Sequence, residues 1–358
     1  MRIKKALFLG TLCTAVSGMS LFAQAGVSYA KSAEKTTEAA SSEEAESEEE
    51  TSEEVTYPIT IEHAFGETVI ESKPERIATI DWENQDTPLA LGVAPVGVSA
   101  ADYGMVTDNN LHPWTDEAFA DLGVEKPVVF DDVDGLDFEQ ISDCNPDVIL
   151  AAYSGMTQED YDTLSQIAPV IPYKEKAWQT SWREQTIENA EGMGMKPEGE
   201  KKVKEVEDLI AEKLEEYPQL EGIPTAFCWI SADDFSTFYV YLPTDPRAAY
   251  LLDLGFTLPE SVQKLAGETD DFNITVSREN ADQLDDIQLM VVYGDEDLLK
   301  SLQEDKLMSQ IPAIKNGAVA LVDSTSALAG ACTPSILSIP YEIDEYLQLL
   351  SDAAENIK

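Results

Sequence analysis

The chain has 358 residues, with 69 acidic and 23 basic side chains, and its formal net charge at pH 7 is −46. A protein this acidic has no basic surface for a phosphate backbone, which excludes nucleic acid as a partner. Hydrophobic residues make up 43% of the composition, and roughly 300 ordered residues are enough to bury the cores of two lobes.

Residues 1–30 have the pattern of a secretory signal peptide. Basic residues precede the apolar run 6–16, and small residues leading to Ala25 and Ala30 provide two cleavage sites. Cys13 lies inside the apolar run after Leu12, a larger residue than lipid attachment normally prefers. The sequence therefore predicts export with cleavage after Ala25 or Ala30. Lipid attachment at Cys13 is the less favoured alternative.

Residues 31–56 hold ten glutamates and two lysines among serine, threonine and alanine. Such a segment cannot bury enough apolar surface to order itself, and its like charges repel one another. We expect a disordered acidic tether, with a processed pro-segment as the alternative.

Three cysteines follow the signal, Cys144, Cys228 and Cys332. An odd number at wide spacing does not make a disulfide framework, even in an exported chain. We expect all three to be small core residues.

From residue 57 onwards, short β-forming stretches alternate with helical ones. The hairpin expected first covers 57–62 and 68–70. Further strands are expected at 77–80, 96–98, 128–130, 148–151, 170–171, 225–231, 237–242, 289–293 and 318–322. Helical segments are expected at 86–91, 109–122, 138–144, 158–168, 180–193, 197–217, 247–254, 280–284, 298–303, 308–311 and 339–350. This alternation predicts α/β lobes built on parallel sheets.

The stretch 197–217 is the longest expected helix. Its apolar residues fall three and four apart, at Val203, Val206, Ile210 and Leu214 among others, and Pro218 ends it. It is either an ordinary surface helix or a strut between two lobes. On the second interpretation the chain divides into an N-terminal lobe at 57–179, a helical connector at 180–218 and a C-terminal lobe at 219–358.

Aromatic and arginine side chains gather after the predicted strands. Parallel sheets bind ligands beyond the carboxyl ends of their strands, and rings with a few guanidinium groups suit a large anionic ligand. Any single ring could instead pack in a core. The candidate ligand-binding residues are Trp82, Tyr103, Tyr153, Trp178, Trp182, Arg183, Tyr239, Tyr241 and Arg247.

Catalytic and metal-binding motifs are absent from the sequence. It has no GxSxG, HExxH, P-loop or CxxC pattern, and His63 and His112 are its only histidines. Bare transition metals normally need several imidazole ligands, and the Asp-Asp pairs lack calcium-loop spacing. The sequence therefore predicts neither a catalytic residue nor a protein-bound metal, and an enzyme is the least favoured class.

Six stretches in order resemble the iron-siderophore solute-binding proteins of ABC importers, over residues 57–350. They are SKPERIATIDWENQDTPLALGVAPVGV, FEQISDCNPDVILAAYSG, SWREQT, DPRAAYLLDLGF, TVSRENADQLDD and TPSILSIPYEIDEYL. The resemblance implies two Rossmann-like α/β lobes joined by one rigid helix, with a cleft for a ferric siderophore, haem or a corrinoid.

The same resemblance implies a partner, the permease of an ABC transporter. By motif position, Glu139 in FEQI and Glu279 in SREN would dock on permease arginines. Either could equally be an ordinary surface glutamate. The family's usual lipobox is missing, so the mode of attachment stays open.

The sequence therefore predicts an exported, monomeric solute-binding protein at the extracytoplasmic face of the cell membrane, at the cell surface or in a periplasm. It has no intrinsic cofactor, and its ligand is a ferric siderophore. The shortage of arginine favours a hydroxamate over a strongly anionic catecholate. The alternatives are haem or cobalamin on the same fold, or a surface scaffold protein without a ligand.

Overall fold

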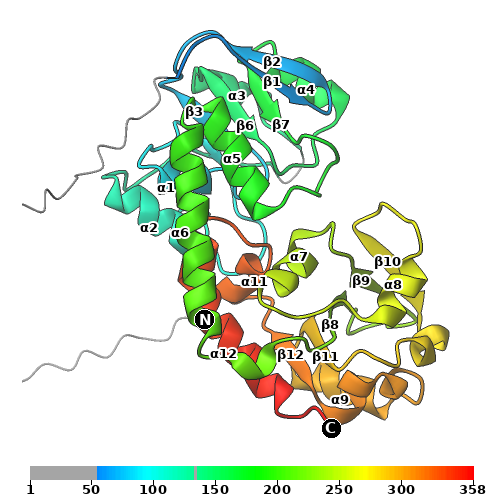
Figure 1. Cartoon of the computed structure of the whole chain (residues 1–358). Helices are drawn as coiled ribbons and strands as arrows, with labels where there is room; N and C mark the ends of the chain where they lie inside the picture. The colour runs from blue at the N-terminus through cyan, green and yellow to red at the C-terminus, as the bar shows by residue number, and fades with distance from the viewer. Residues whose placement is uncertain (1–54, 133–134) are drawn as a thin grey trace, which may run out of the picture. The chain divides into compact units, whose positions relative to one another are not determined.

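The computed structural model describes residues 55–132 and 135–358. The predicted signal peptide, Cys13 and nearly all of the acidic tether lie outside these residues. The described chain opens with an antiparallel hairpin, in which β1 pairs with β2 and His63 lies opposite Gly66 (Figure 1). The hairpin strands are β1 Ile59–His63 and β2 Gly66–Ile70.

The N-terminal lobe contains short parallel strands. The three-stranded sheet has the order β3-β6-β7, and β4 pairs in parallel with β5. A parallel bridge between Ala78 and Gly97 joins the two pieces, so the carboxyl ends of all five strands lie at one edge. The strands are β3 Ile77–Thr79, β4 Val98–Ser99, β5 Val129–Phe130, β6 Val148–Ala151 and β7 Val170–Pro172.

Helices between these strands begin at recognisable caps. Thr157 and Ser181 each form a capping box with an acidic residue three positions later, which satisfies two free backbone N–H groups. The helices of this half are α1 Asp86–Ala90, α2 Pro113–Asp121, α3 Phe138–Asp143, α4 Gln158–Leu164 and α5 Trp182–Gly192.

The C-terminal lobe has one five-stranded sheet with the order β10-β9-β8-β11-β12. Strands β8, β11 and β12 are parallel, whereas β9 runs antiparallel to both β8 and β10. Parallel pairing, as expected, thus holds for β8, β11 and β12, and β9 is the strand that departs from it. The strands are β8 Thr225–Trp229, β9 Thr237–Tyr241, β10 Asn273–Ser277, β11 Leu289–Tyr293 and β12 Val319–Val322.

Helices lie around this second sheet, and α12 is the longest of them (Figure 1). The helical segments are η1 Pro218–Leu220, α7 Pro246–Asp253, α8 Glu260–Ala266, η2 Arg278–Gln283, α9 Glu296–Glu304, η3 Met308–Gln310, α10 Pro312–Asn316, α11 Ala327–Ala331 and α12 Ser338–Ala354.

Helix α6, Lys196–Leu214, confirms the long helix expected at 197–217, and it ends three residues earlier because η1 begins at Pro218. It packs against α5 and α12 (Figure 1). Its buried face consists of Gly199, Val203, Val206 and Ile210. A Cβ on Gly199 would lie 2.5 Å from the Ala190 Cβ, so this glycine permits the close approach of α5 and α6.

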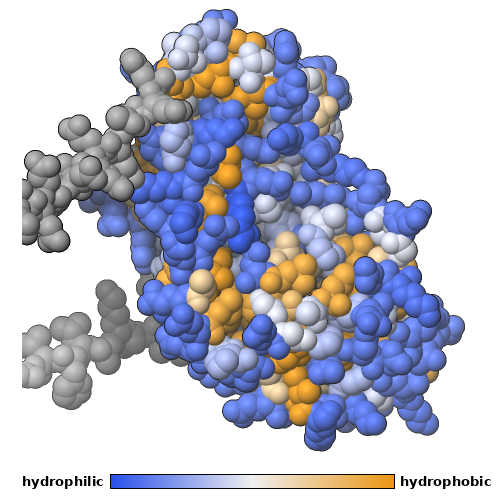
Figure 2. Space-filling view, viewed as in Figure 1, coloured by the Kyte–Doolittle hydropathy of each residue, from blue (hydrophilic) through white to orange (hydrophobic). Residues whose placement is uncertain are grey.

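The sheets and helices bury separate apolar cores in the two halves. Strands β6 and β11 are almost wholly buried, as expected for central parallel strands covered on both faces. Cys144, Cys228 and Cys332 are free and buried, which confirms their assignment to the core. The face seen in Figure 2 is mostly hydrophilic, as the excess of acidic residues implies.

Candidate functional site

Aromatic side chains surround a cavity of about 350 Å³, which we call the aromatic cavity. This volume lies within the range of small-molecule sites, and apolar walls with a few polar groups are their usual composition. Eight of its ten lining residues are aromatic. They are Trp82, Tyr103, Tyr153, Trp178, Trp229, Tyr241, Phe272 and Tyr293, and the other two are Arg247 and Thr333.

Strand ends supply four of these eight rings. Trp82 and Tyr153 follow the neighbouring strands β3 and β6, and Trp229 and Tyr293 are the last residues of β8 and β11. Because parallel strands end at the same edge of a sheet, each lobe presents its aromatic residues together. The cavity is therefore lined from both sheets.

Tyr241 reaches the cavity by a different route. Strand β9 is antiparallel, so its carboxyl end does not lie beside the carboxyl ends of β8 and β11. The Tyr241 ring lies instead on the face of the sheet, with its centroid 5.8 Å from that of Phe227. Tyr241 therefore lines the cavity, but not for the reason that led to its prediction, a position at the carboxyl end of a parallel strand.

Arg247 is the one arginine among the residues that line the aromatic cavity. Its Nε and Nη2 donate to the two carboxylate oxygens of Asp245 at 2.8 and 2.7 Å, and Asp245 is fully buried. The guanidinium carbon lies 4.0 Å from the centroid of the Tyr241 ring. The bidentate pair fixes the arginine and balances its charge, so this group adds donors to the cavity without a net positive charge.

Trp178 is held against Gly155 and Tyr153. A Cβ on Gly155 would lie 2.5 Å from Trp178 Cζ2, so only glycine leaves room for the indole. Trp178 has a positive φ of 61°, a conformation that L residues rarely adopt, and its N–H donates to the Ser154 carbonyl at 3.1 Å. The Tyr153 and Trp178 rings meet edge to face at 5.3 Å.

The tyrosine hydroxyls of the cavity are held in the protonated form. Burial raises the pKa of Tyr103 to about 12, and it also raises the pKa of Tyr153, Tyr241 and Tyr293. These phenols can therefore donate hydrogen bonds to a ligand, while the phenolate form is disfavoured.

Two predicted residues, Trp182 and Arg183, are not among those that line the aromatic cavity. Trp182 is 2% exposed, and its Nε1 donates to Asp253 at 3.0 Å. Arg183 donates through Nη1 to Asp253 at 2.7 Å and through Nε to Glu207 at 2.6 Å. The pair begins α5 and ties it to α6 and α7, so its polar groups already have partners inside the protein.

Tyr239 also lies outside the lining residues. It is 40% exposed, and its ring centroid is 5.5 Å from that of Trp229, which does line the cavity. Cross-strand pairing places the two rings opposite each other on β9 and β8. Tyr239 therefore packs against Trp229, a residue of the cavity wall.

Four lining residues were missed in the sequence, Trp229, Phe272, Tyr293 and Thr333. The rule applied to the other strand ends would have found Tyr293, and it would have found Trp229 had β8 been expected to end at 229 instead of 231. Phe272 precedes β10, a strand that was not predicted. Thr333 follows α11 and is the first residue of the stretch TPSILSIPYEIDEYL, so the resemblance to the family marked its position although strand ends did not.

The two predicted docking glutamates are exposed. Glu139 lies in the first turn of α3 in the N-terminal lobe, and Glu279 lies in the first turn of η2 in the C-terminal lobe. Neither carboxylate takes part in the ion pairs found among the described residues.

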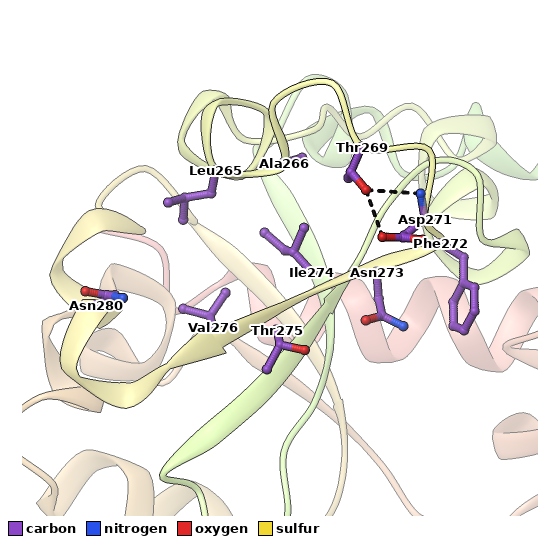
Figure 3. Close-up of a pocket in the computed structure, with 10 residues that line it drawn as sticks. All are labelled: Leu265, Ala266, Thr269, Asp271, Phe272, Asn273, Ile274, Thr275, Val276 and Asn280. Carbon is purple, nitrogen blue, oxygen red and sulfur yellow. Dashed lines mark hydrogen bonds between the residues drawn. The ribbon is translucent and has the colours of Figure 1, made fainter.

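A larger hollow of about 540 Å³ runs along the edge strand β10 (Figure 3). Leu265 and Ala266 of α8 lie on one side of it, and Ile274 lies on the strand. Its described lining residues include no tryptophan, tyrosine or arginine, so the aromatic cavity is the better candidate for a ligand of large planar surface.

Within residues 55–132 and 135–358, no group of three or more histidine, cysteine or acidic side chains could hold a metal ion. Among the same residues no helix is both long enough and apolar enough to cross a membrane.

A family model described as periplasmic binding protein matches residues 77–325. The chain belongs to this family. The match spans both sheets, and the two-lobed α/β architecture of the structure is that of a periplasmic binding protein. Proteins of this family bind solutes, so the chain is a binding protein and not an enzyme.

Solved structures and characterised relatives agree with the family. Streptococcus pneumoniae TIGR4 PiaA in complex with ferrichrome is 48% identical, covering 84% of this chain and 100% of that chain with a TM-score of 0.81. The petrobactin-binding protein YclQ of Bacillus subtilis is 25% identical over 305 residues, which is 81% of this chain and 88% of the relative. Staphylococcus aureus SirA, complexed with staphyloferrin B, shares the fold at 23% identity, 84% and 99% coverage and a TM-score of 0.64.

Proposed function

We propose that this periplasmic binding protein captures a ferric hydroxamate siderophore in the aromatic cavity and delivers it to an ABC permease for iron uptake. A protein that is 48% identical over the whole of its solved length holds ferrichrome, a siderophore, in its crystal structure. The iron is cargo here, since it stays coordinated by its chelator while the protein contacts the organic shell of the complex.

The observation that carries the choice of a hydroxamate is the pairing of Arg247 with Asp245. Arg247, the cationic donor of the cavity, forms an ion pair with the buried carboxylate of Asp245, 2.7 Å away. A complex of high negative charge would need uncompensated cations, as paired charges supply little net attraction. Rings and protonated phenols suit a bulky complex with little net charge, whose oxygens accept hydrogen bonds.

The tyrosines also weigh against haem. A tyrosine that ligates haem iron does so through its oxygen, and deprotonation makes it the stronger ligand. Burial raises the pKa of the four cavity phenols and so opposes deprotonation.

We place the permease contact at Glu139 and Glu279. Each is exposed at the start of a helical segment, one in each lobe, where a pair of exposed charges can steer and register a docking partner. The protein would act as a monomer outside the cytoplasm, after export by residues 1–30 and on a tether formed by residues 31–56. We keep 57–179, 180–218 and 219–358 as the N-terminal lobe, the connector and the C-terminal lobe.

A titration of the purified protein followed by tryptophan fluorescence tests the ligand. The aromatic cavity contains Trp82, Trp178 and Trp229, so a bound ferric complex will quench emission. Ferrichrome should bind with a Kd of about 1 μM or tighter. A ferric catecholate, haem and cobalamin should bind much more weakly. Tighter binding of haem or cobalamin would overturn the ligand assignment, and no response to any of the four would overturn the binding function.

An uptake assay tests the docking residues separately. The double variant Glu139→Ala, Glu279→Ala should lose siderophore uptake while ferrichrome affinity stays normal. The matched control is Glu159→Ala, Glu296→Ala, which removes two exposed first-turn glutamates from α4 and α9. Normal uptake by the first variant, or an equal loss in the control, would refute the assignment of the docking surface.

A further inference from the structure

A second hollow of about 440 Å³ adjoins the aromatic cavity, and we call it the acidic pocket. Trp82 and Trp178 line both spaces, so a ligand in the aromatic cavity lies directly beside it. The pocket is formed at the carboxyl ends of three neighbouring strands. Asp81 follows β3, Ser99 ends β4 and Asp132 follows β5.

Ser99 links two of the aspartates that line this pocket. The Asp81 backbone N–H donates to Ser99 Oγ at 2.9 Å, and Ser99 Oγ donates in turn to Asp132 Oδ2. Asp81 has a φ of +60°, so the chain turns sharply at the end of β3 to present its carboxylate. The two carboxylates therefore lie in one concave space, where the charge of each disfavours ionisation of the other.

The described lining of the acidic pocket contains no lysine or arginine. Its one histidine, His112, is engaged on both sides, with Nδ1 3.0 Å from Glu83 Oε1 and Nε2 2.9 Å from the Tyr103 carbonyl oxygen. Burial lowers the pKa of His112 and raises that of Glu83, so the pair favours its neutral form. No protein cation among the described lining residues balances Asp81, Asp102 and Asp132.

Buried acceptors without partners complete the pocket. Gln85 is 5% exposed, lines the pocket, and its Oε1 has no hydrogen-bond partner among the described residues. Asp132 Oδ1 is also buried without a partner there. A buried acceptor without a donor is unfavourable, so these oxygens call for a ligand that donates several hydrogen bonds.

We propose that the acidic pocket receives a protonated amine on a side arm of the siderophore bound in the aromatic cavity. This inference rests on the proposed function, and within the ferric hydroxamates it names those that carry a cationic arm as the preferred ligands. A primary ammonium has three donors and one positive charge, which matches the unpartnered acceptors and the uncompensated aspartates. The described residues that line the pocket do not form a metal-binding group, so an organic cation is the better occupant.

Two probes with the same iron centre, one with a terminal ammonium and one without, test this inference. Ferrioxamine B is a linear ferric trihydroxamate ending in a primary ammonium, and its N-acetyl derivative has the same iron centre without the charge. Wild-type protein should bind the ammonium form about tenfold more tightly, as charge-assisted hydrogen bonds are lost on acetylation. Equal affinities would overturn the inference.

Isosteric variants locate the effect in the pocket. In Asp81→Asn and in Asp132→Asn, the affinity ratio between the two probes should fall towards one. The control is Asp121→Asn, which removes one exposed carboxylate from α2 in the same lobe and should keep the wild-type ratio. This control separates the pocket from the general attraction of a chain with net charge −46 for any cation. An unchanged ratio in both pocket variants would overturn the inference.

The outcome for ferrichrome separates a failure of the inference about the acidic pocket from a failure of the proposed function. If ferrichrome binds and the probes do not differ, the acidic pocket has no role while the proposed function stands. If neither ferrichrome nor either probe binds, the proposed function itself fails, and the inference fails with it.

Discussion

Lys176 in the segment after β7 forms an ion pair with Asp270 in the segment between α8 and β10, through its Nζ. In the same place Gln179 Nε2 donates to the Asp270 carbonyl oxygen at 3.0 Å. These contacts join the two lobes beside Trp178 and Phe272, which line the aromatic cavity. They bridge the lobes next to the aromatic cavity.

Removing this bridge should speed ligand exchange. We expect Lys176→Met to raise the dissociation rate of ferrichrome by a factor of about two to five, because exposed ion pairs contribute little. Stopped-flow displacement at low and high salt measures the rate, and the difference from wild type should vanish at about 1 M salt. Lys204→Met, which breaks the exposed Lys204–Asp208 pair of α6, is the matched control. A rate unaltered by Lys176→Met at low salt would contradict this role.

Gly155 should be required for the position of Trp178. Gly155→Ala puts a methyl group into the space of the indole and should raise the Kd for ferrichrome by about tenfold, as for the loss of a buried aromatic contact. The test is a double-mutant cycle with Trp178→Ala. In the absence of the indole, Gly155→Ala should cost almost nothing further. Additive losses would show that the methyl group acts elsewhere.

Arg247 and Arg183 should differ in what they support. Arg247→Met should raise the Kd for ferrichrome by about tenfold, because the cavity loses its guanidinium donors. The variant also leaves Asp245 buried without its partner, so Arg247→Met should be compared with Arg247→Met, Asp245→Asn, which removes the stranded charge. The measurement is calorimetric titration. Wild-type affinity in the double variant would remove Arg247 from the ligand contacts.

Arg183→Met should instead lower the free energy of unfolding, by about 1–2 kcal/mol, because two carboxylates on α6 and α7 lose their shared donor. Urea unfolding measures this change, and ferrichrome affinity measured on the folded variant should equal that of wild type. A large loss of ferrichrome affinity with a normal free energy of unfolding would show that Arg183 contacts the ligand.

The stability of the protein should depend on pH through Asp81. Burial raises the pKa of this carboxyl to about 7, with further contributions from Asp132, Asp160 and Asp102. A folded pKa above the unfolded value stabilises the folded state at low pH, and this contribution is lost as pH rises through about 7. Asp81→Asn cannot ionise, so its stability relative to wild type should increase between pH 5 and pH 8.

Urea unfolding of Asp81→Asn and wild type at the two pH values measures that difference. The difference between the proteins isolates Asp81 from the other carboxyls with raised pKa, such as Glu188 and Glu342. A pH-independent difference would mean that Asp81 has an ordinary pKa in the folded protein.

Local patterns were sufficient to predict most elements of the fold. The strand at 148–151 and the strand at 289–293 were predicted with the bounds of β6 and β11, because continuous apolar runs identify buried strands. Short helices such as α10 and α11 were missed, since five residues make too few turns to show a period. The antiparallel direction of β9 was indicated by its short connection to β8, since residues 230–236 are too few for a parallel crossover, but the alternation rule did not use that length.

The candidate site was predictable to the extent that it depends on strand ends. Trp82 and Tyr153 were found by that rule, whereas Trp182 and Arg183 were misplaced because their partners come from α6 and α7. Asp253 lies 70 residues further along the chain from Arg183, and only the packed helices bring them together. The acidic pocket was missed because the Asp-Asp pairs were considered only for calcium-loop spacing, and Asp81 belongs to none of them.

Cys332 lies immediately before Thr333, whose side chain lines the aromatic cavity, and it is fully buried. Burial raises the pKa of its thiol to about 12. Thiolates, rather than thiols, bind metals and enter redox reactions. Cys332, next in sequence to a residue that lines the cavity, is thus kept in the thiol form, which is the weaker metal ligand and the weaker reductant.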